Sequence, residues 1–182
     1  MILNPIEVKD KRGQCIVLRS AEEADAEDML RYMKETSAET SWLLREPEEN
    51  RMTMEREISF IREMQESERD LMLVATMDGT HIGNASFNSS GRFQRLAHRC
   101  GVAIALYRKY WGRGIGEQMM RVLLAEAKKA GYEQAELEVV ADNKAAVALY
   151  EKIGFQTHGH LPRYMKYKDG SYADALWMAK EL

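Results

Sequence analysis

Near the centre of this chain, the pattern of apolar positions predicts a strand, a turn and a helix in direct succession. Residues 102–106 are continuously apolar, which is typical of a strand buried on both faces. A polar turn containing Gly112, Gly114 and Gly116 follows. From Met119 onward, apolar residues recur every three or four positions as far as residue 130. A glycine-rich turn is therefore expected to connect a buried strand to the start of a helix.

The apolar patterns elsewhere predict further strands and helices. Besides the central strand, into which the segment from residue 94 leads, expected strands are residues 15–19, 71–77, 81–88, 135–140, 155–168 and 172–179. Expected helices follow Ser20, span residues 54–67 and end near Gly154. A capping box at Ser20 and Glu23 is expected to open the first helix, and Asp142 or Asn143 to cap the last. Residues 1–14 are interpreted as a short lead, and residues 36–52 remain ambiguous. The order of elements predicts an α+β protein with a mixed sheet.

Composition narrows the class of protein. A length of 182 residues suits a single domain over residues 1–182, and a net charge of −3 with interspersed signs gives no indication of nucleic-acid or membrane binding. No apolar run approaches the roughly 20 residues of a membrane span, and no signal peptide is recognised. Cys15 and Cys100 are far apart, which fits a reducing compartment, and no His/Cys cluster indicates a metal. We expect a cytoplasmic protein without a metal.

The central turn has the features of an anion site. The first N–H groups of a helix lack partners within the helix, and the helix dipole places partial positive charge there. Glycines allow a phosphate to approach the backbone. A dinucleotide fingerprint would require the third glycine at Glu117 or Met119, and a P-loop would require a G-K-[S/T] triplet, so both motifs fail on spacing. A ligand that carries a pyrophosphate is the first hypothesis, and a structural turn that merely needs glycines is the alternative.

Two motifs together resemble those of one family. Trp111-x-x-Gly114-x-Gly116 resembles the R/Q-x-x-G-x-G/A signature of the GNAT superfamily of N-acetyltransferases. The segment from Asn143 through Tyr150 to Phe155 resembles the family's N-x-x-A-x-x-L-Y-x-x-x-G-F block. Trp111 departs from the usual Arg or Gln, a trait that some members of the superfamily share. The resemblance implies the GNAT fold, in which helices flank a mixed, mostly antiparallel central sheet, and acetyl-CoA as co-substrate.

The resemblance also implies roles for individual residues. Tyr150 matches the general acid that protonates the departing thiolate, although a tyrosine packed on the sheet would look the same. Asn143 matches a helix-capping residue that often touches the co-substrate. Arg113 is either a charged contact to the pyrophosphate or a solvated loop cation. The residues implied in acetyl-CoA binding are Ile104, Ala105, Leu106, Trp111, Gly112, Arg113, Gly114, Ile115, Gly116, Glu117 and Asn143.

The general base and the acceptor stay open. Some GNAT enzymes carry a glutamate on the central strand, and the aligned position here is Cys100, which cannot simply replace it. His98, Glu138 or a water chain are the alternatives. The acceptor pocket is expected between the segment after the first helix and the last hairpin. The residues concerned are Trp42, Glu46, Glu48, Glu49, Arg163, Tyr164 and Tyr167.

The acidic cluster in that segment would favour a cationic amine, and an exposed polar loop is its plainer interpretation. The expected function is acetyl transfer to a primary amine: an amino acid, a polyamine or a protein N-terminus. The alternative is a non-catalytic acyl-CoA-binding or sensory module of the same fold. The family often forms dimers, so a homodimer is also considered.

Overall fold

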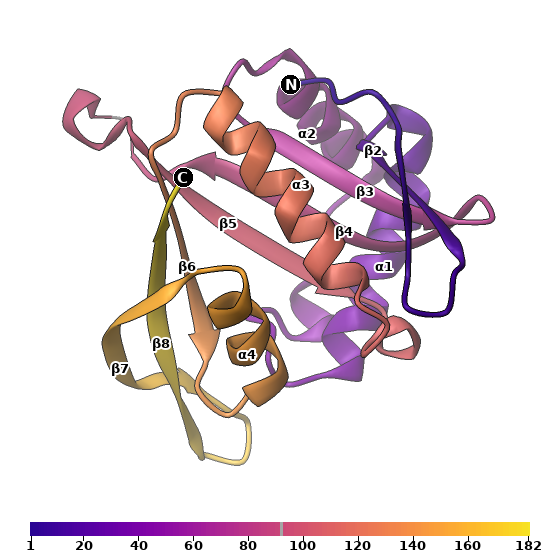
Figure 1. Cartoon of the computed structure of the whole chain (residues 1–182). Helices are drawn as coiled ribbons and strands as arrows, with labels where there is room; N and C mark the ends of the chain where they lie inside the picture. The colour runs from indigo at the N-terminus through magenta and orange to yellow at the C-terminus, as the bar shows by residue number, and fades with distance from the viewer. Residues whose placement is uncertain (92) are drawn as a thin grey trace.

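Eight strands form one sheet in the order β1-β2-β3-β4-β5-β6-β8-β7 (Figure 1). The computed structural model describes residues 1–91 and 93–182. The strands are β1 Ile6–Lys9, β2 Cys15–Ser20, β3 Leu71–Met77, β4 Thr80–Ser89, β5 Arg99–Leu106, β6 Gln134–Val140, β7 Gln156–Lys166 and β8 Tyr172–Glu181. Every neighbouring pair is antiparallel except β5 and β6, which are parallel. The expected mixed, mostly antiparallel sheet is confirmed.

Helices cover both faces of the sheet. The α-helices are α1 Ala26–Glu39, α2 Met54–Glu66, α3 Ile115–Lys129 and α4 Lys144–Lys152. Figure 1 shows α3 across one face and α1 and α2 on the other, with α4 beside the ends of β6 and β8. The larger apolar core lies under α3, whose Met119, Met120 and Leu123 are fully buried against the strands. The helical repeat predicted from Met119 is therefore the buried face of α3.

The parallel strands β5 and β6 stay together only at their beginnings. They pair at Arg99–Gln134, Cys100–Ala135 and Gly101–Glu136, and then they separate. Beyond Gly101, β5 continues to pair with β4 as far as Leu106, while β6 pairs with β8 as far as Val140. The sheet is thus open between the second halves of β5 and β6, and one edge of the β5 backbone there pairs with no strand among residues 1–91 and 93–182.

Two features of the N-terminal region correct the sequence prediction. Residues 6–9, which the apolar pattern assigns to a lead, form β1 and pair with β2 from Ile6–Leu18 to Lys9–Cys15. Four residues at a sheet edge are too few for a periodic signal to stand out. The capping box at Ser20 and Glu23 is also wrong, because the residues that cap each other are Glu22 and Asp25. Ser20 instead accepts a hydrogen bond from the N–H of Leu3 at 2.6 Å.

The helix ends agree with the sequence prediction. Gly131 follows α3 with φ 85°, and Gly154 follows α4 with φ 99°, as expected of C-terminal stops. Of the two candidate caps for α4, the side chain of Asn143 makes the bond, accepting the N–H of Ala146 at 3.2 Å. The ambiguous segment after residue 36 contains the end of α1 and a short 3-10 turn at Pro47–Glu49. No helix in the described part of the chain has both the length and the apolarity needed to cross a membrane.

Candidate active site

A cavity of ≈ 840 Å³ occupies the opening between β5 and β6. Its walls come from α1 and the loop after it, from β5 and the turn that follows, from β6, from α4 and from β7. The structure brings together nearly all of the residues named from the motifs. Those that line the cavity are Ile104, Ala105, Leu106, Trp111, Gly112, Gly114, Ile115, Gly116, Glu117, Asn143 and Tyr150.

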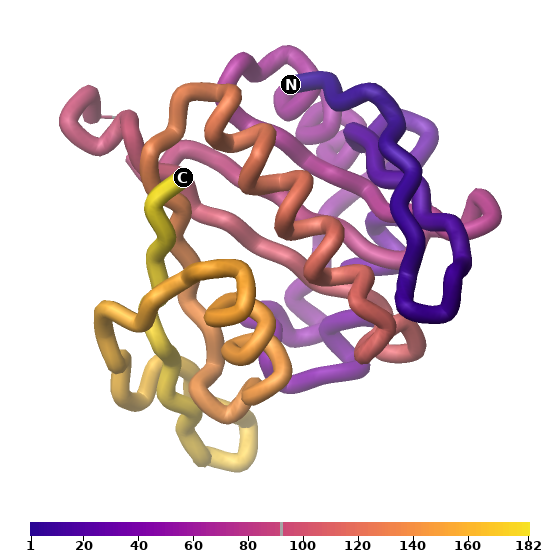
Figure 2. Tube along the Cα trace, in the orientation of Figure 1, coloured from indigo at the N-terminus to yellow at the C-terminus, as the bar shows by residue number. Residues whose placement is uncertain are grey.

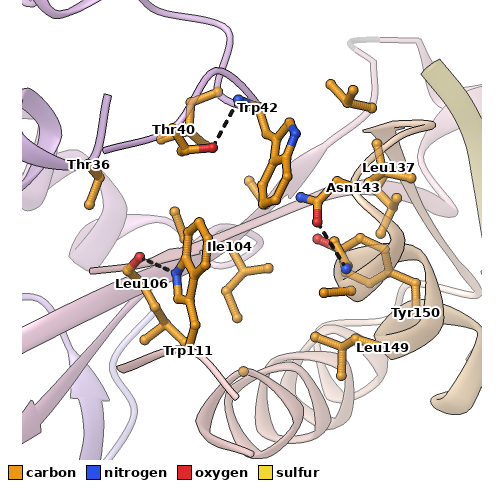
Figure 3. A pocket seen from close by; sticks show the side chains of 18 of the residues that line it. Thr36, Thr40, Trp42, Ile104, Leu106, Trp111, Leu137, Asn143, Leu149 and Tyr150 are labelled. Carbon is orange, nitrogen blue, oxygen red and sulfur yellow. Dashed lines mark hydrogen bonds between the residues drawn. The ribbon is translucent and has the colours of Figure 1, made fainter. Parts of the chain in front are cut away.

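Two aromatic side chains hydrogen-bond to backbone carbonyls at the end of β5. The hydroxyl of Tyr32, on α1, donates to the carbonyl of Ala105 at 2.7 Å, on the side of β5 that pairs with β4. The indole Nε1–H of Trp111 donates to the carbonyl of Leu106 at 2.8 Å (Figure 3). Backbone groups without a strand partner need such bonds. Trp111 therefore satisfies part of the edge of β5 that β6 leaves open.

The turn before α3 exposes the beginning of the helix to the cavity. Gly114 is the N-cap of α3 and has φ 79°, a conformation that L-residues with side chains rarely adopt. A Cβ on Gly116 would lie 3.4 Å from Leu149 and 3.7 Å from Ile104, which are ordinary contact distances, so α3 lies close to α4 and β5 at this point. The arrangement presents free N–H groups and the positive end of the helix dipole to a ligand.

Glu117, in the first turn of α3, carries a neutralised charge. Its carboxylate accepts bonds from Lys152 at 2.5 Å and from Arg121 at 2.9 Å. These two cations hold the pKa of Glu117 below its ordinary value. The backbone of Glu117 remains available to an anion, while the side chain is occupied elsewhere.

The side chain of Arg113 is not placed as the charged phosphate contact considered above. Arg113 is buried and does not line the cavity. Its Nε donates to Asp10 at 2.7 Å, and its Nη2 reaches Gln14 and, at 3.5 Å, the sulfur of Met77. The alternative interpretation, a solvated loop cation, is wrong because the side chain is buried. Spacing along the chain carries no information about a partner 103 positions away.

Tyr150 is buried in the wall formed by α4, on the same side of the cavity as Asn143 (Figure 3). Its ring packs against Phe155 with the ring centroids 5.8 Å apart. Burial raises the pKa of Tyr150 to about 12. The phenol is therefore protonated throughout the ordinary pH range and can donate a hydrogen bond into the cavity.

The candidates for a general base are separated by the structure. His98 precedes β5, is exposed and does not line the cavity; its carbonyl accepts the N–H groups of Glu133 and Gln134. Glu138, on β6, does line the cavity. Cys100 is fully buried, and burial raises the pKa of its thiol to about 12, which suits a core residue. Its position in the cavity wall thus favours Glu138 over His98 as the general base.

The loop after α1 and the β7–β8 hairpin meet at the other end of the cavity. Trp42, from this loop, stacks on Trp111 with ring centroids 5.6 Å apart and an interplanar angle of 18° (Figure 3). The hydroxyl of Tyr167 donates to the carbonyl of Ser41 at 3.2 Å. Trp42 and Tyr164 both line the cavity. The two segments expected to surround an acceptor therefore do enclose one end of the cavity.

The acidic residues of that loop are paired, which the sequence did not reveal. Lys168 lies 3.3 Å from Glu46 and 3.0 Å from Glu48. Glu49 accepts the backbone N–H of Glu46 in a capping interaction. Opposite charge within 4 Å offsets the attraction that these carboxylates would exert on a cationic amine. The plainer interpretation of the cluster, an exposed polar loop, is the one that the structure supports.

An irregularity in β7 separates Arg163 from Tyr164. The pairing of β7 with β8 is interrupted between Leu161 and Met165, and Arg163 has φ 55°. Its guanidinium lies 4.0 Å from the ring centroid of Tyr172, away from the cavity lining, whereas Tyr164 belongs to that lining. Bulges of this kind change the direction in which a side chain points.

Two residues at the site had no signal in the sequence. Tyr32 reads as one more position on the buried face of a helix, and Lys11 as part of a polar turn in the supposed lead. Both line the cavity. Only the pairing of distant segments brings them there.

Comparison with known proteins identifies the class. Residues 29–155 match the acetyltransferase (GNAT) family, and the chain belongs to this family. Its fold is that of the acetyltransferase of the GNAT family from Streptococcus pneumoniae, with a TM-score of 0.88, 25% identity, and coverage of 92% of this chain and 99% of that one.

Two curated relatives carry more specific names. N-alpha-acetyltransferase RimI of Mycobacterium tuberculosis is 39% identical over 110 residues, which are 59% of this chain and 63% of the relative. L-amino acid N-acetyltransferase AaaT of Escherichia coli is 29% identical over 109 residues, which are 59% of this chain and 66% of the relative. The chain thus spans a little less than two thirds of the length of these relatives.

Proposed function

We propose that this chain transfers an acetyl group from acetyl-CoA to a primary amine. One observation carries the proposal: a single cavity joins the open edge of β5, the N-terminus of α3 and the hydroxyl-bearing face of α4. An elongated donor with a pyrophosphate at one end and a thioester at the other needs the helix N-terminus for its pyrophosphate, the strand edge for the arm between them and the hydroxyl beside its sulfur. Membership of the acetyltransferase family supports the same reaction.

The donor would be held mainly by backbone. Gly112, Gly114, Ile115, Gly116 and Glu117 would offer N–H groups to the pyrophosphate, helped by the dipole of α3. Ile104, Ala105 and Leu106 would offer the unpaired edge of β5 to the amide-bearing arm.

The hydrogen bond from the Trp111 indole to the Leu106 carbonyl limits how many hydrogen bonds the edge of β5 can offer to the ligand. It leaves one lone pair of the Leu106 carbonyl for the ligand. When bound, acetyl-CoA supplies an activated acyl group.

The acceptor nitrogen attacks the thioester carbon directly in the proposed reaction. A nitrogen–carbon bond forms, the carbon–sulfur bond breaks, the amine gives up one proton, and the departing thiolate takes one proton from solvent. Glu138 is the lining carboxylate proposed to take the proton from the amine, either directly or through water. No enzyme nucleophile is needed.

Tyr150 is proposed to donate a hydrogen bond to the sulfur as the bond to carbon breaks. A full transfer from a phenol with a pKa of about 12 to a thiolate of ordinary pKa, roughly 8.5, is unfavourable. The contribution of Tyr150 is therefore greatest while charge develops on the sulfur, since a donor fixed in a water-poor wall stabilises that charge.

The acceptor end of the cavity favours an amine with an apolar portion. Its lining includes Trp42, Leu43, Tyr164 and Met165. The names of the two relatives, an N-alpha-acetyltransferase and an L-amino acid N-acetyltransferase, are consistent with an amino acid or a protein N-terminus as acceptor. Polyamines are proposed as weaker acceptors because Lys168 occupies the nearby carboxylates.

Release of free CoA thiol across an acceptor panel tests the proposal. The panel contains apolar and polar amino acids, polyamines, and peptides with different N-termini, and Tyr150→Phe is assayed beside the wild type. Turnover with one class, reduced in the variant, supports the proposed reaction and names the acceptor class. Binding of acetyl-CoA without turnover on any acceptor would instead favour the acyl-CoA-binding module. Failure to bind acetyl-CoA would remove both functions.

A further inference from the structure

The turn between β1 and β2 lies directly against the turn that precedes α3. Figure 2 shows the indigo N-terminal hairpin reaching the beginning of the salmon helix α3. The N–H of Lys11 donates to the carbonyl of Arg113 at 2.9 Å. Two segments about a hundred positions apart in the sequence therefore share one wall of the cavity.

A buried ion pair holds the two turns together. Asp10 accepts the N–H groups of Arg12 at 2.9 Å and Gln14 at 2.8 Å with one oxygen. Its other oxygen accepts Arg113, with Nε at 2.7 Å and Nη2 at 2.6 Å. The side chains of Arg113 and Asp10 are 8% and 0% exposed. Such a fork-shaped contact, satisfied on both sides, fixes the position and direction of the hairpin turn.

Lys11 extends from this fixed turn over the N-cap of α3. A Cβ placed on Gly114 would lie 3.2 Å from Cγ, 3.3 Å from Cε and 3.6 Å from Cδ of Lys11. The stem of the lysine thus packs on the glycine, and the residue lines the cavity. Lys11 is an exposed residue, and its ammonium group makes no ion pair with any carboxylate in the described part of the chain.

The other cations near this end of the cavity are occupied. Lys152 lines the cavity but binds the carboxylate of Glu117 at 2.5 Å. Arg113 is committed to Asp10. Arg45 also lines the cavity, but it comes from the loop after α1, at the acceptor end. Within the described lining, Lys11 is thus the cation that lies at the glycine turn with its charge free.

We propose that Lys11 binds the pyrophosphate of acetyl-CoA, completing the anion site at the N-terminus of α3 with a charge supplied by the β1–β2 turn. The inference rests on the proposed function, because it assigns a residue to the same co-substrate. A flexible ammonium suits this role because it contacts phosphate oxygens as a point charge, while backbone N–H groups set the geometry. The proposal also gives the Asp10–Arg113 pair a purpose, since the pair places the lysine.

Lys11→Met tests the proposal, because methionine keeps an apolar stem against Gly114 and removes only the charge. Arg12→Met is the matched control, because this substitution changes the net charge by the same amount. Arg12 is exposed, lies in the same turn and does not line the cavity. We expect the Kd for CoA by calorimetry to rise about five- to tenfold in Lys11→Met and less than twofold in Arg12→Met. In turnover, KM for acetyl-CoA rises by the same factor, kcat is unchanged, and Lys11→Arg restores most of the affinity.

The same measurement with dephospho-CoA, which lacks the 3′-phosphate, identifies the phosphate concerned. An equal loss of affinity in Lys11→Met supports contact with the pyrophosphate, and a loss seen only with CoA overturns it. Equal effects of Lys11→Met and Arg12→Met would also overturn it, because they would reflect charge at a distance. A wild type that binds no CoA would instead contradict the proposed function itself. Thermal unfolding of both variants checks that the fold is retained.

Discussion

The two ends of the cavity are built in different ways. At the donor end, one continuous stretch supplies β5, the glycine turn and the start of α3, and α4 closes the wall. At the acceptor end, the loop after α1 meets the β7–β8 hairpin through contacts such as Tyr167–Ser41, whose partners lie 126 positions apart. The first end relies on backbone and glycine geometry, and the second on exposed side chains.

This difference predicts how each end of the cavity responds to amino-acid substitution. Backbone groups and positive φ angles cannot be replaced by another side chain, so small substitutions at the donor end have large effects. Exposed polar contacts and a single aromatic stack each contribute little, so the acceptor end tolerates substitution. The acceptor can therefore change while the donor stays the same.

The largest expected effect is at Gly114. Gly114→Val places a branched side chain on a residue with φ 79° and against Lys11, in the path of the phosphate. We expect no saturable CoA binding up to about 100 times the wild-type Kd, measured by calorimetry. Gly131→Val is the control, because Gly131 has φ 85° and nothing within 4 Å of a Cβ. Both variants lose roughly 1–2 kcal/mol of stability. Intact CoA binding in Gly114→Val would show that the turn does not hold the phosphate.

Tyr150→Phe is expected to lower kcat by ~10²-fold while the Kd for CoA stays within about threefold, the range for losing a general acid or its hydrogen bond. Tyr164→Phe, on the acceptor side of the cavity, is the matched control and leaves kcat within a few-fold. Because burial raises the pKa of Tyr150 to about 12, ionisation of this phenol should not lower the wild-type kcat below pH ~10. An unchanged kcat in Tyr150→Phe would remove the residue from the mechanism.

The stack of Trp42 on Trp111 joins the two ends and should have an intermediate effect. Trp42→Ala is expected to raise KM for the amine about three- to tenfold, since an aromatic pair contributes ~0.5–1.5 kcal/mol beyond its buried area. Trp111→Gln, which installs a residue usual in the family, should cost a similar factor. A double-mutant cycle distinguishes coupling from independent losses. Simple additivity would show that the stack does not shape the acceptor end, and Trp177→Phe, outside the cavity lining, serves as the control.

The smallest effects are expected at the acidic loop. Because Lys168 already pairs with Glu46 and Glu48, Glu46→Gln and Glu48→Gln should each change KM for a diamine less than about twofold. Lys168→Met exposes both carboxylates and should lower that KM about two- to threefold at low salt, an effect that disappears at high salt. A large loss of diamine activity in Glu48→Gln would mean that the carboxylates attract the acceptor after all.

The donor end of the cavity could be predicted from the sequence more fully than the acceptor end. The strand, glycine turn and helix around Gly114 were predicted correctly because neighbouring residues determine them: an apolar run, a positive-φ turn and a helical repeat. Asn143 and Tyr150 both line the cavity, because one caps the short helix α4 and the other lies in it. His98 was a poor candidate for a base because an exposed residue ahead of β5 looks, in sequence, like part of the strand. The pairing of β1 with β2 was missed because pairing depends on a partner, not on the four residues themselves.

Taken alone, the sequence determined the family-type motifs, the order of elements and the local geometry of the donor end, because these depend on residues within one or two turns of each other. Only the tertiary structure decided which partner or site each charged side chain contacts. It buries Arg113 against Asp10, neutralises the acidic loop with Lys168 and brings Lys11 to the N-terminus of α3. The physical reason is that electrostatic and hydrogen-bond partners are chosen by proximity in space, which the pairing of distant strands and loops creates.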